Sequence, residues 1–193
     1  MPDLSALIQR WQGGDERAAE AIYHHHREAT FRLAYGLLGN AADAEEAAQD
    51  ALTYALIHIN HFDPGRATFP TWLHTIAVSR CRDRQRRRWL PTFSLTQWLQ
   101  RGQDAPDPAP SLERQAIQGE THSEVWQAVQ NLSPQLREAI LLRYWADHTY
   151  QEMAAILDCP LRTAQSRVRL AYDKLRAVLA SAELNHFEEE RAQ

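Results

Sequence analysis

The sequence is poor in cysteine, with only Cys81 and Cys159 among 193 residues. Two thiols are too few for a disulfide framework or for a zinc site built on cysteine. Cys159 also lies between two helical patterns, directly before Pro160. We therefore expect two ordinary buried thiols, no metal and no cofactor.

Long apolar runs are also missing. The longest, such as residues 139–142, fall far short of the roughly 20 residues that cross a bilayer. The N-terminus lacks the basic and then apolar layout of a signal peptide. We expect a cytoplasmic protein without membrane insertion.

A third absence is the alternation of apolar and polar residues that is typical of strands. Apolar residues instead recur at helical spacing, in a chain with 44% hydrophobic and 24% charged residues. The pattern predicts an all-α protein. Prolines at alternate positions in residues 106–110 exclude a regular helix there and indicate a linker between two small domains. The predicted parts are an N-terminal domain at residues 1–92, a linker at residues 93–120, a C-terminal domain at residues 121–180 and an acidic tail at residues 181–193.

Start and stop signals divide the chain into helices. Asn40 is placed to cap a helix whose first turn is acidic, and Ser133 followed by Pro134 starts another. Thr149 and Glu152 form a capping-box pattern for a short helix. A break at residues 158–160 and then a basic helix follow. Two helices joined in this way are typical of a helix-turn-helix.

Net charge is −4, which by itself argues against nucleic acid. Phosphate binding, however, needs only a local basic patch. Residues 80–88 hold six arginines and one aspartate, a net +5, and residues 162–176 hold five basic residues and one aspartate, a net +4. We therefore expect two segments that contact nucleic acid.

The second basic segment has two distinct faces on a helical wheel. The apolar face carries Ala164, Val168, Ala171 and Leu175. The opposite face offers side chains that can donate to base edges or phosphates, namely Arg162, Thr163, Gln165, Ser166 and Arg169. Arg167 lies on the flank and suits a phosphate. A solvated basic helix without a partner is the alternative interpretation.

Three consecutive histidines, His24 to His26, suggest a metal site and hence a metal-dependent helical enzyme. On a helix they point about 100° apart and cannot converge on one ion, so we expect solvent-exposed side chains. The acidic residues of 43–50 have no evident partner in the sequence, and we interpret them as a solvated or partner-facing surface rather than an acid-base site.

Several segments, taken in order, resemble the extracytoplasmic-function group of bacterial sigma factors. They are residues 40–50, residues 69–77 followed by Asp83 and Arg86 to Arg88, residues 132–144, residues 150–154 and residues 163–167. The resemblance implies an alternative sigma factor and not an enzyme. Its implied partners are core RNA polymerase, through the clamp coiled coil and the flap, promoter DNA, and an anti-sigma factor.

The same resemblance assigns roles to individual residues. Core polymerase would be bound by Asp43, Glu45, Glu46, Gln49 and Asp50. The minus-ten element, with a flipped base on single-stranded DNA, would meet Ser79, Arg80, Asp83, Arg84, Arg87 and Arg88. The minus-thirty-five element would be read as a duplex by Arg162, Thr163, Gln165, Ser166, Arg167 and Arg169.

Two departures from the family pattern bear on structure. Arg82 stands where the family usually has an apolar residue, and we expect it to rotate or loosen its helix. Asp158 replaces the usual glycine of the turn, which aspartate tolerates because it visits left-handed geometry more readily than most residues. The alternative function is a stand-alone helix-turn-helix regulator with a helical sensor domain, which would not require the tryptophan-then-arginine pattern of residues 72–88.

Overall fold

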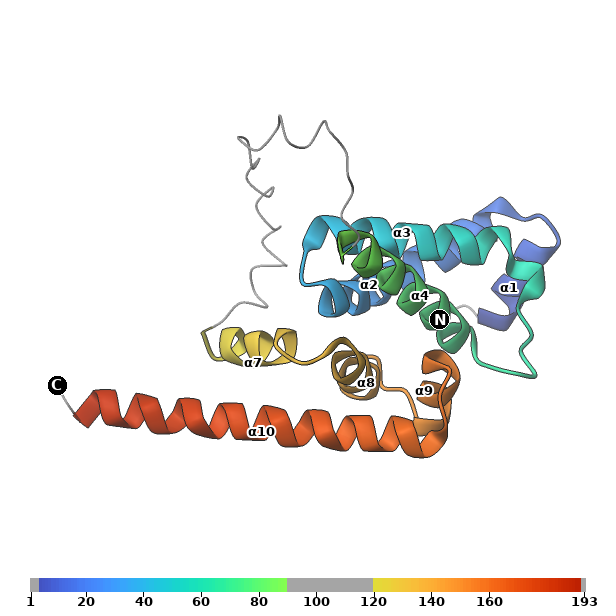
Figure 1. Cartoon of the computed structure of the whole chain (residues 1–193). Helices are drawn as coiled ribbons and strands as arrows, with labels where there is room; N and C mark the ends of the chain where they lie inside the picture. The colour runs from blue at the N-terminus through green and yellow to red at the C-terminus, as the bar shows by residue number, and fades with distance from the viewer. Residues whose placement is uncertain (1–3, 90–119, 192–193) are drawn as a thin grey trace.

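The computed structural model describes residues 4–89 and 120–191, without the side chains of 88–89, 120–123 and 181–191. Within these ranges the secondary structure is helical and no strand occurs, which confirms the all-α prediction. The helices form two groups, one stacked on the other (Figure 1). Nearly all of the predicted linker, up to residue 119, lies outside the described residues.

The first group, residues 4–89, is called the N-terminal half. It consists of α1 (Leu4–Gln12), α2 (Glu16–Leu38), α3 (Ala41–Ile57), the short 3-10 helix η1 (Ile59–His61) and α4 (Phe69–Trp89). Burial of Ile22, Leu52 and Leu73 joins α2, α3 and α4 in one apolar cluster that α1 closes from the side. None of the described helices is both long enough and apolar enough to span a membrane.

Local interactions set the helix ends, including the cap predicted at Asn40. Gly39 ends α2 with a left-handed φ of 69°, and the side chain of Asn40 then accepts a hydrogen bond from the Asp43 backbone N–H at 2.9 Å. Helix α4 begins at Phe69, one residue before Pro70. These local interactions fix where α3 and α4 start, and so which of their side chains face each other.

The second group, residues 120–191, is called the C-terminal half. It consists of α7 (Glu120–Gln130), α8 (Pro134–Tyr144), α9 (Tyr150–Leu157) and α10 (Leu161–Arg191). Pro134 occupies the first turn of α8, and Thr149 and Glu152 form the predicted capping box at the start of α9. Helix α10 continues through most of the segment predicted as an acidic tail.

Helices α9 and α10 form the predicted helix-turn-helix. Asp158 ends α9 with a left-handed φ of 49°, as expected for the residue in place of a turn glycine. Ala164, Val168 and Ala171 are buried, and Leu175 packs against the same cluster. The wheel assignment of the apolar face of α10 is therefore confirmed.

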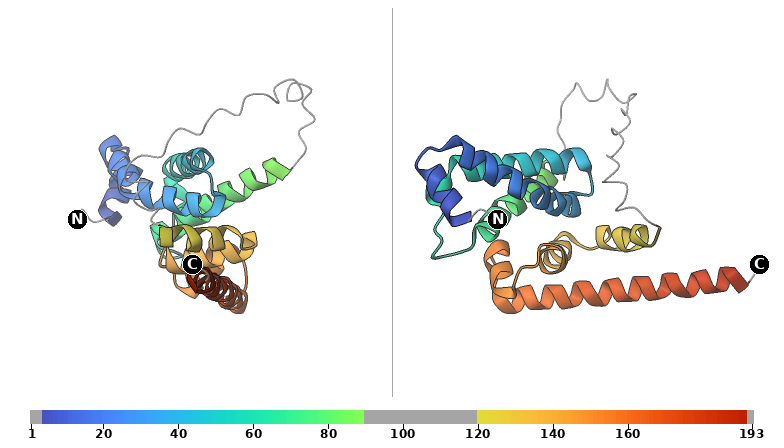
Figure 2. Two further views of the ribbon diagram at one scale, coloured as in Figure 1. Left: turned by 90° about the vertical axis from the view of Figure 1, so that its left-hand side faces the viewer. Right: turned by 180° about the vertical axis from the view of Figure 1, so that it is seen from behind.

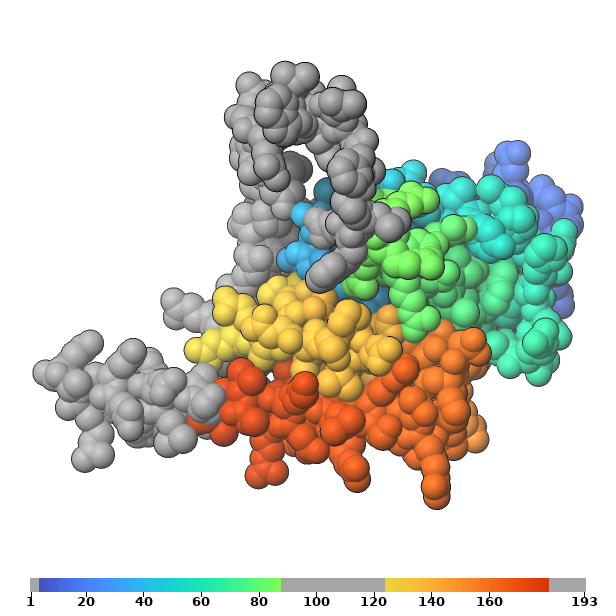
Figure 3. All heavy atoms as spheres, in the orientation of Figure 1, coloured from blue at the N-terminus to red at the C-terminus, as the bar shows by residue number. Residues whose placement is uncertain are grey.

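The two halves pack directly against each other, which the sequence did not predict. One apolar cluster runs through both, with Leu37 and Val78 from the N-terminal half and Leu141 and Met153 from the C-terminal half. Gly36 permits the close approach, because a Cβ atom at this position would lie 2.8 Å from Leu141 Cδ1. The rotated ribbon views and the space-filling view show the C-terminal half lying directly against the N-terminal half (Figures 2 and 3).

We expect Leu142→Ala to lower the free energy of unfolding by about 2–5 kcal/mol, because Leu142 is fully buried in the apolar cluster that runs through both halves and truncation leaves a cavity. Leu170→Ala is the matched control, since Leu170 on α10 is 48% exposed and should change stability by no more than about 0.5 kcal/mol. Urea unfolding followed by circular dichroism measures both. Equal losses in the two variants would contradict the described packing.

Candidate nucleic-acid interface

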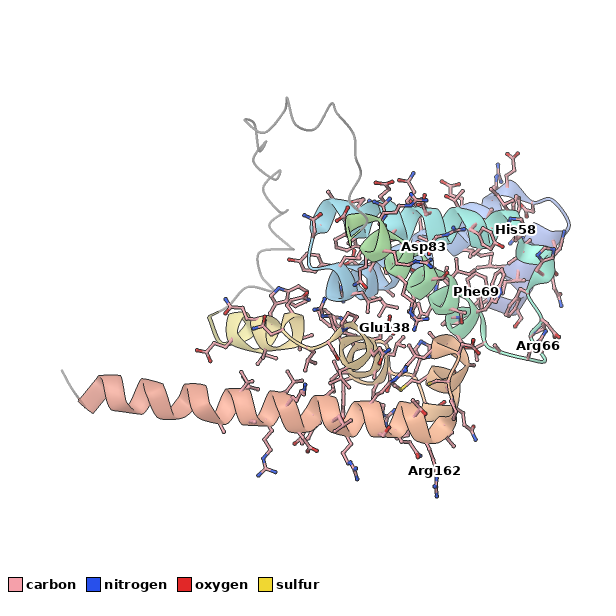
Figure 4. All side chains as sticks on the ribbon, viewed as in Figure 1. His58, Arg66, Phe69, Asp83, Glu138 and Arg162 are labelled. Carbon is pink, nitrogen blue, oxygen red and sulfur yellow. The ribbon has the colours of Figure 1, made fainter. Side chains whose placement is uncertain are left out.

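The start of α10 presents a polar surface on the side facing away from the N-terminal half. An open depression is lined by five of the six residues predicted to read duplex DNA, namely Arg162, Thr163, Gln165, Ser166 and Arg169. Figure 4 shows the Arg162 side chain extending outward from the helix start. The structure thus brings these predicted residues together, while Arg167 is half-buried at the flank.

The backbone at this end of α10 also favours an anion. The first turn of a helix has N–H groups without intrahelical partners, and the helix dipole adds positive potential there. Two of these N–H groups are already used, because those of Thr163 and Ala164 donate to the carbonyl of Pro160 at 2.8 and 3.1 Å, so the backbone attracts an anion here mainly through the helix dipole. With Ala164 fixed in the core, the neighbouring polar side chains are held on the free face. This arrangement suits the phosphates and base edges of a DNA groove.

The arginines of α4 differ in their surroundings because they lie at different angles on the helix. The guanidinium of Arg80 lies over the ring of Tyr54, with its carbon 4.9 Å from the ring centroid. Ser79 and Arg87 are exposed, and Asp83 forms an ion pair with Arg86. The side chain of Arg88 lies outside the described residues.

Arg84 is enclosed by carboxylates of α3, although it was expected among the residues that contact DNA. Its guanidinium lies 3.5 Å from Asp43 Oδ1 and 3.9 Å from Asp50 Oδ2, forms an ion pair with Glu46, and is only 17% exposed. The hydrogen bond from Arg84 is the main reason why the pKa of Glu46 lies below its usual value. The acidic residues therefore have a partner within the chain, supplied by the packing of α3 against α4.

The remaining residues predicted to bind polymerase lie on the same exposed side of α3. Glu45 forms an ion pair with Arg27 of α2 at 3.1 Å. Gln49 and Asp50 are exposed. Asp43, Glu45, Glu46, Gln49 and Asp50 are together called the α3 polar face, and α3 lies on the side of the N-terminal half away from α8 and α9 (Figure 1).

Arg82 has a role that its sequence context did not suggest. The expectation that it loosens its helix is wrong, because α4 is continuous from Phe69 to Trp89. The guanidinium donates two hydrogen bonds of 2.7 Å to the carboxylate of Glu138 on α8, whose side chain is only 6% exposed. Arg82 therefore joins the two halves, and no short-range pattern signals a partner 56 residues away.

The histidine triplet is split between solvent and core. His24 and His25 are exposed as expected, but His26 is buried, and burial lowers its pKa to about 4. A 100° step per residue turns one of three consecutive side chains inward when a helix is covered on one side. Among the described residues no three potential metal ligands come together.

The two cysteines are free thiols. Cys81 is buried as expected, and burial raises its pKa to about 12. Cys159 is only half-buried, because it lies in the turn between α9 and α10. Neither residue carries chemistry that the predicted sites need.

Both halves of the chain match known protein families. Residues 22–90 match Sigma-70 region 2, and residues 122–175 match Sigma-70 region 4. The RNA polymerase sigma-H factor of Pseudomonas aeruginosa is 30% identical over 177 residues, which cover 87% of this chain and 91% of that protein. The ECF RNA polymerase sigma factor RpoE of Cereibacter sphaeroides is 33% identical over 165 residues, which cover 84% and 86%.

Solved structures share the fold. The chain is similar to CnrH, solved in complex with the cytosolic domain of CnrY, with a TM-score of 0.66, 22% identity and coverage of 91% of this chain and 96% of that one. It is also similar to the sigma factor RpoE from Bartonella quintana, solved in complex with the anti-sigma factor NepR, with a TM-score of 0.62, 23% identity and coverage of 83% and 96%. The two-domain helical architecture is thus that of solved proteins.

We expect Arg84→Ala to return the pKa of Glu46 towards its ordinary range, because the main cause of its lowering is the hydrogen bond from Arg84. Carboxyl carbon NMR of Glu46 as a function of pH measures the change. Arg86→Ala is the matched control, since Arg86 lies on the same helix but pairs with Asp83. A Glu46 pKa that stays low without Arg84 would contradict the described ion pair.

Proposed function

The chain belongs to the extracytoplasmic-function group of RNA polymerase sigma factors, and we propose that its two halves recognise different elements of one promoter. It is an alternative sigma factor that directs RNA polymerase to promoters. The alternative of a stand-alone regulator with a sensor domain does not hold, because the N-terminal half matches the same family. The role requires no covalent chemistry by this chain, since nucleotide addition belongs to the polymerase.

The C-terminal half binds the minus-thirty-five element as a duplex. The observation that supports this most is the depression lined by polar side chains of α10, opposite a buried apolar face. Arg162, Gln165 and Arg169 can donate to guanine or adenine edges in the major groove. Arg167 at the flank contacts a phosphate, which contributes affinity but no sequence preference.

The N-terminal half binds the minus-ten element, and its predicted contacts differ in how accessible they are. Ser79, Arg80 and Arg87 have surfaces that single-stranded DNA can reach. Arg84 acts indirectly, because its guanidinium is held by the carboxylates of α3. Asp83 and Arg88 remain proposed contacts on the same helix.

The α3 polar face binds the clamp coiled coil of core polymerase, and the C-terminal half binds the flap. Arg84 fixes Asp43 and Glu46 from the inner side, while Gln49 and Asp50 stay exposed for the partner. An anti-sigma factor is a further proposed partner, as the solved relatives were studied with such proteins or with a cytosolic domain. A protein that works with RNA polymerase acts in the cytoplasm.

In vitro transcription with core polymerase and a library of genomic promoters tests the proposed function. We expect transcripts from a defined set of templates that depend on this chain. Failure of the folded chain to support transcription from any template would overturn the proposal.

We expect Asp50→Lys to weaken binding to core polymerase by about tenfold or more, because like charges across an interface cost several kcal/mol. Asp50 is exposed and is the most distant of the three carboxylates around Arg84, at 3.9 Å, so helical circular dichroism should be unchanged. Glu20→Lys is the matched control, since Glu20 is an exposed acid on α2, outside the α3 polar face. Fluorescence anisotropy with labelled chain measures both affinities, and equal effects would argue against the assigned surface.

We expect Arg169→Ala to change the preferred upstream sequence, because the variant lacks a contact to a base edge. The free energy that discriminates against the wrong base at that position should fall by about 1–3 kcal/mol. Arg167→Ala should weaken all sequences alike and reduce the salt dependence by about one phosphate contact. Selection from randomised upstream DNA at several salt concentrations separates the two. An Arg169→Ala variant with the wild-type preference would mean that α10 is oriented differently in the groove.

A further inference from the structure

With the two halves packed together, the distance between their proposed DNA-binding surfaces is too short for both promoter elements to be bound at once. The minus-ten and minus-thirty-five elements are about 25 base pairs apart, which is about 85 Å along duplex DNA. In the structure α4 packs on α9 and α9 packs on α10, which places α4 and the start of α10 roughly 20 Å apart. The halves must therefore separate for promoter binding, an argument that rests on the proposed function.

The surface between the halves contains paired polar groups as well as apolar side chains. Arg82 pairs with Glu138, and the Thr71 hydroxyl donates to Glu152 Oε1 at 2.9 Å. Such pairs fix the register of the two halves, and water can replace them when the halves separate. None of these contacts involves a group that ordinarily titrates near neutral pH.

One contact across the same surface does involve such groups. His74 of α4 and His148, in the loop before α9, are both buried, and His74 Nδ1 lies 2.7 Å from His148 Nε2. The loop is held in place because the His148 N–H donates to the Leu142 carbonyl at 3.0 Å and Arg143 donates to the His148 carbonyl at 2.9 Å. The histidine pair is therefore a fixed element of the interface.

The protons of this contact can be assigned from its surroundings. His148 Nδ1 lies 3.7 Å from Glu152 Oε2, which favours a proton on that nitrogen. His148 Nε2 is then the acceptor, and His74 Nδ1 donates to it. A further proton on His148 Nε2 would make both contacting nitrogens, His74 Nδ1 and His148 Nε2, hydrogen-bond donors, and the hydrogen bond would be lost. A further proton on His74 Nε2 would instead leave a positive charge buried between the halves.

We propose that His74 and His148 form a proton-sensitive clasp between the two halves, which holds them together while both rings are neutral and releases them when the cytoplasm becomes acidic. The signal is then the proton itself. Acidification would increase the fraction of chain whose halves are free to engage polymerase and promoter together.

The direction of the pH dependence follows from the state that binds more protons. Burial, with help from His148 and His26, lowers the pKa of His74 to about 3, and burial also lowers the pKa of His148. In separated halves each ring returns to an ordinary value of about 6.5. Docking is therefore fully favoured above about pH 6.5 and is progressively lost as the pH falls below it.

Other charged groups near the clasp modify this behaviour without reversing it. On the side of His148, Glu152 and Asp147 favour the protonated ring, but burial outweighs them. On the side of His74, the neighbouring titratable group is His26 of α2, whose Nε2 is buried without a hydrogen-bond partner among the described residues. His26 becomes charged only at lower pH, because its own pKa is about 4.

The affinity for core polymerase reports the separated fraction even when that fraction is small, because apparent affinity scales with the competent population. When the pH falls from 7.5 to 6.0, each histidine that takes up a proton only in the separated state raises the ratio of separated to docked chain by about fourfold. Two such histidines raise it by about fifteenfold. We expect the wild type to bind core polymerase about fifteenfold more tightly at pH 6.0 than at pH 7.5. The His148→Gln variant should bind only about fourfold more tightly at the lower pH. The double variant of His148→Gln and His74→Gln should lose the dependence.

His24→Gln is the matched control, since His24 is exposed on α2, and it should keep the dependence of the wild type. Equal affinities of the wild type at both pH values would overturn the clasp. So would a double glutamine variant that keeps the full pH dependence. Loss of helical circular dichroism in the wild type at pH 6.0 would also overturn it, because the histidines would then stabilise a half rather than join the two.

A measurement without polymerase separates this inference from the proposed function. His148→Lys removes the acceptor and adds a permanent charge, so the full-length variant at pH 7.5 should have a larger radius of gyration by X-ray scattering, with unchanged helical content. An unchanged radius would overturn the clasp. A larger radius together with no polymerase binding at any pH would support the clasp and count against the proposed function.

Discussion

Helix α4 is packed on two sides, and the rest of the molecule is arranged around this constraint. Leu73 and Ala77 belong to the core of the N-terminal half, whereas Val78 and Cys81 belong to the cluster shared with α8 and α9. A helix covered in this way leaves only a narrow polar strip for solvent. The arginines of α4 therefore meet different surroundings, although in the sequence they form one uniform basic cluster.

The surface between the halves combines close apolar packing with hydrogen-bonded polar pairs. The carboxylate of Glu138, almost inaccessible to solvent, is satisfied by two hydrogen bonds from Arg82. Removing one member of such a pair costs more than separating both into water, where each is solvated again. The surface is thus specific when closed and still compatible with reversible opening, as expected where two domains of one chain must move.

The polar side of α10 that we propose faces DNA is independent of this docking. Ala164 and Val168 lie in the apolar core, and Arg162 at the start of the same helix points away from the N-terminal half (Figure 4). Separation of the halves therefore changes the distance between the two proposed DNA-binding surfaces and leaves the one on α10 intact. The clasp therefore controls whether the two halves are docked or apart, and it does not change the surface of α10.

The sequence by itself determined the helices, their caps, the helix-turn-helix and the free face of α10, because these depend on interactions within about four residues. Only the tertiary structure determined which residues Arg82, Arg84 and His74 contact. Their partners lie 56, 41 and 74 residues away, and which side chains meet across packed helices depends on how the helices are placed. A periodic pattern indicates which side of a helix is buried, but it does not identify the helix that covers that side.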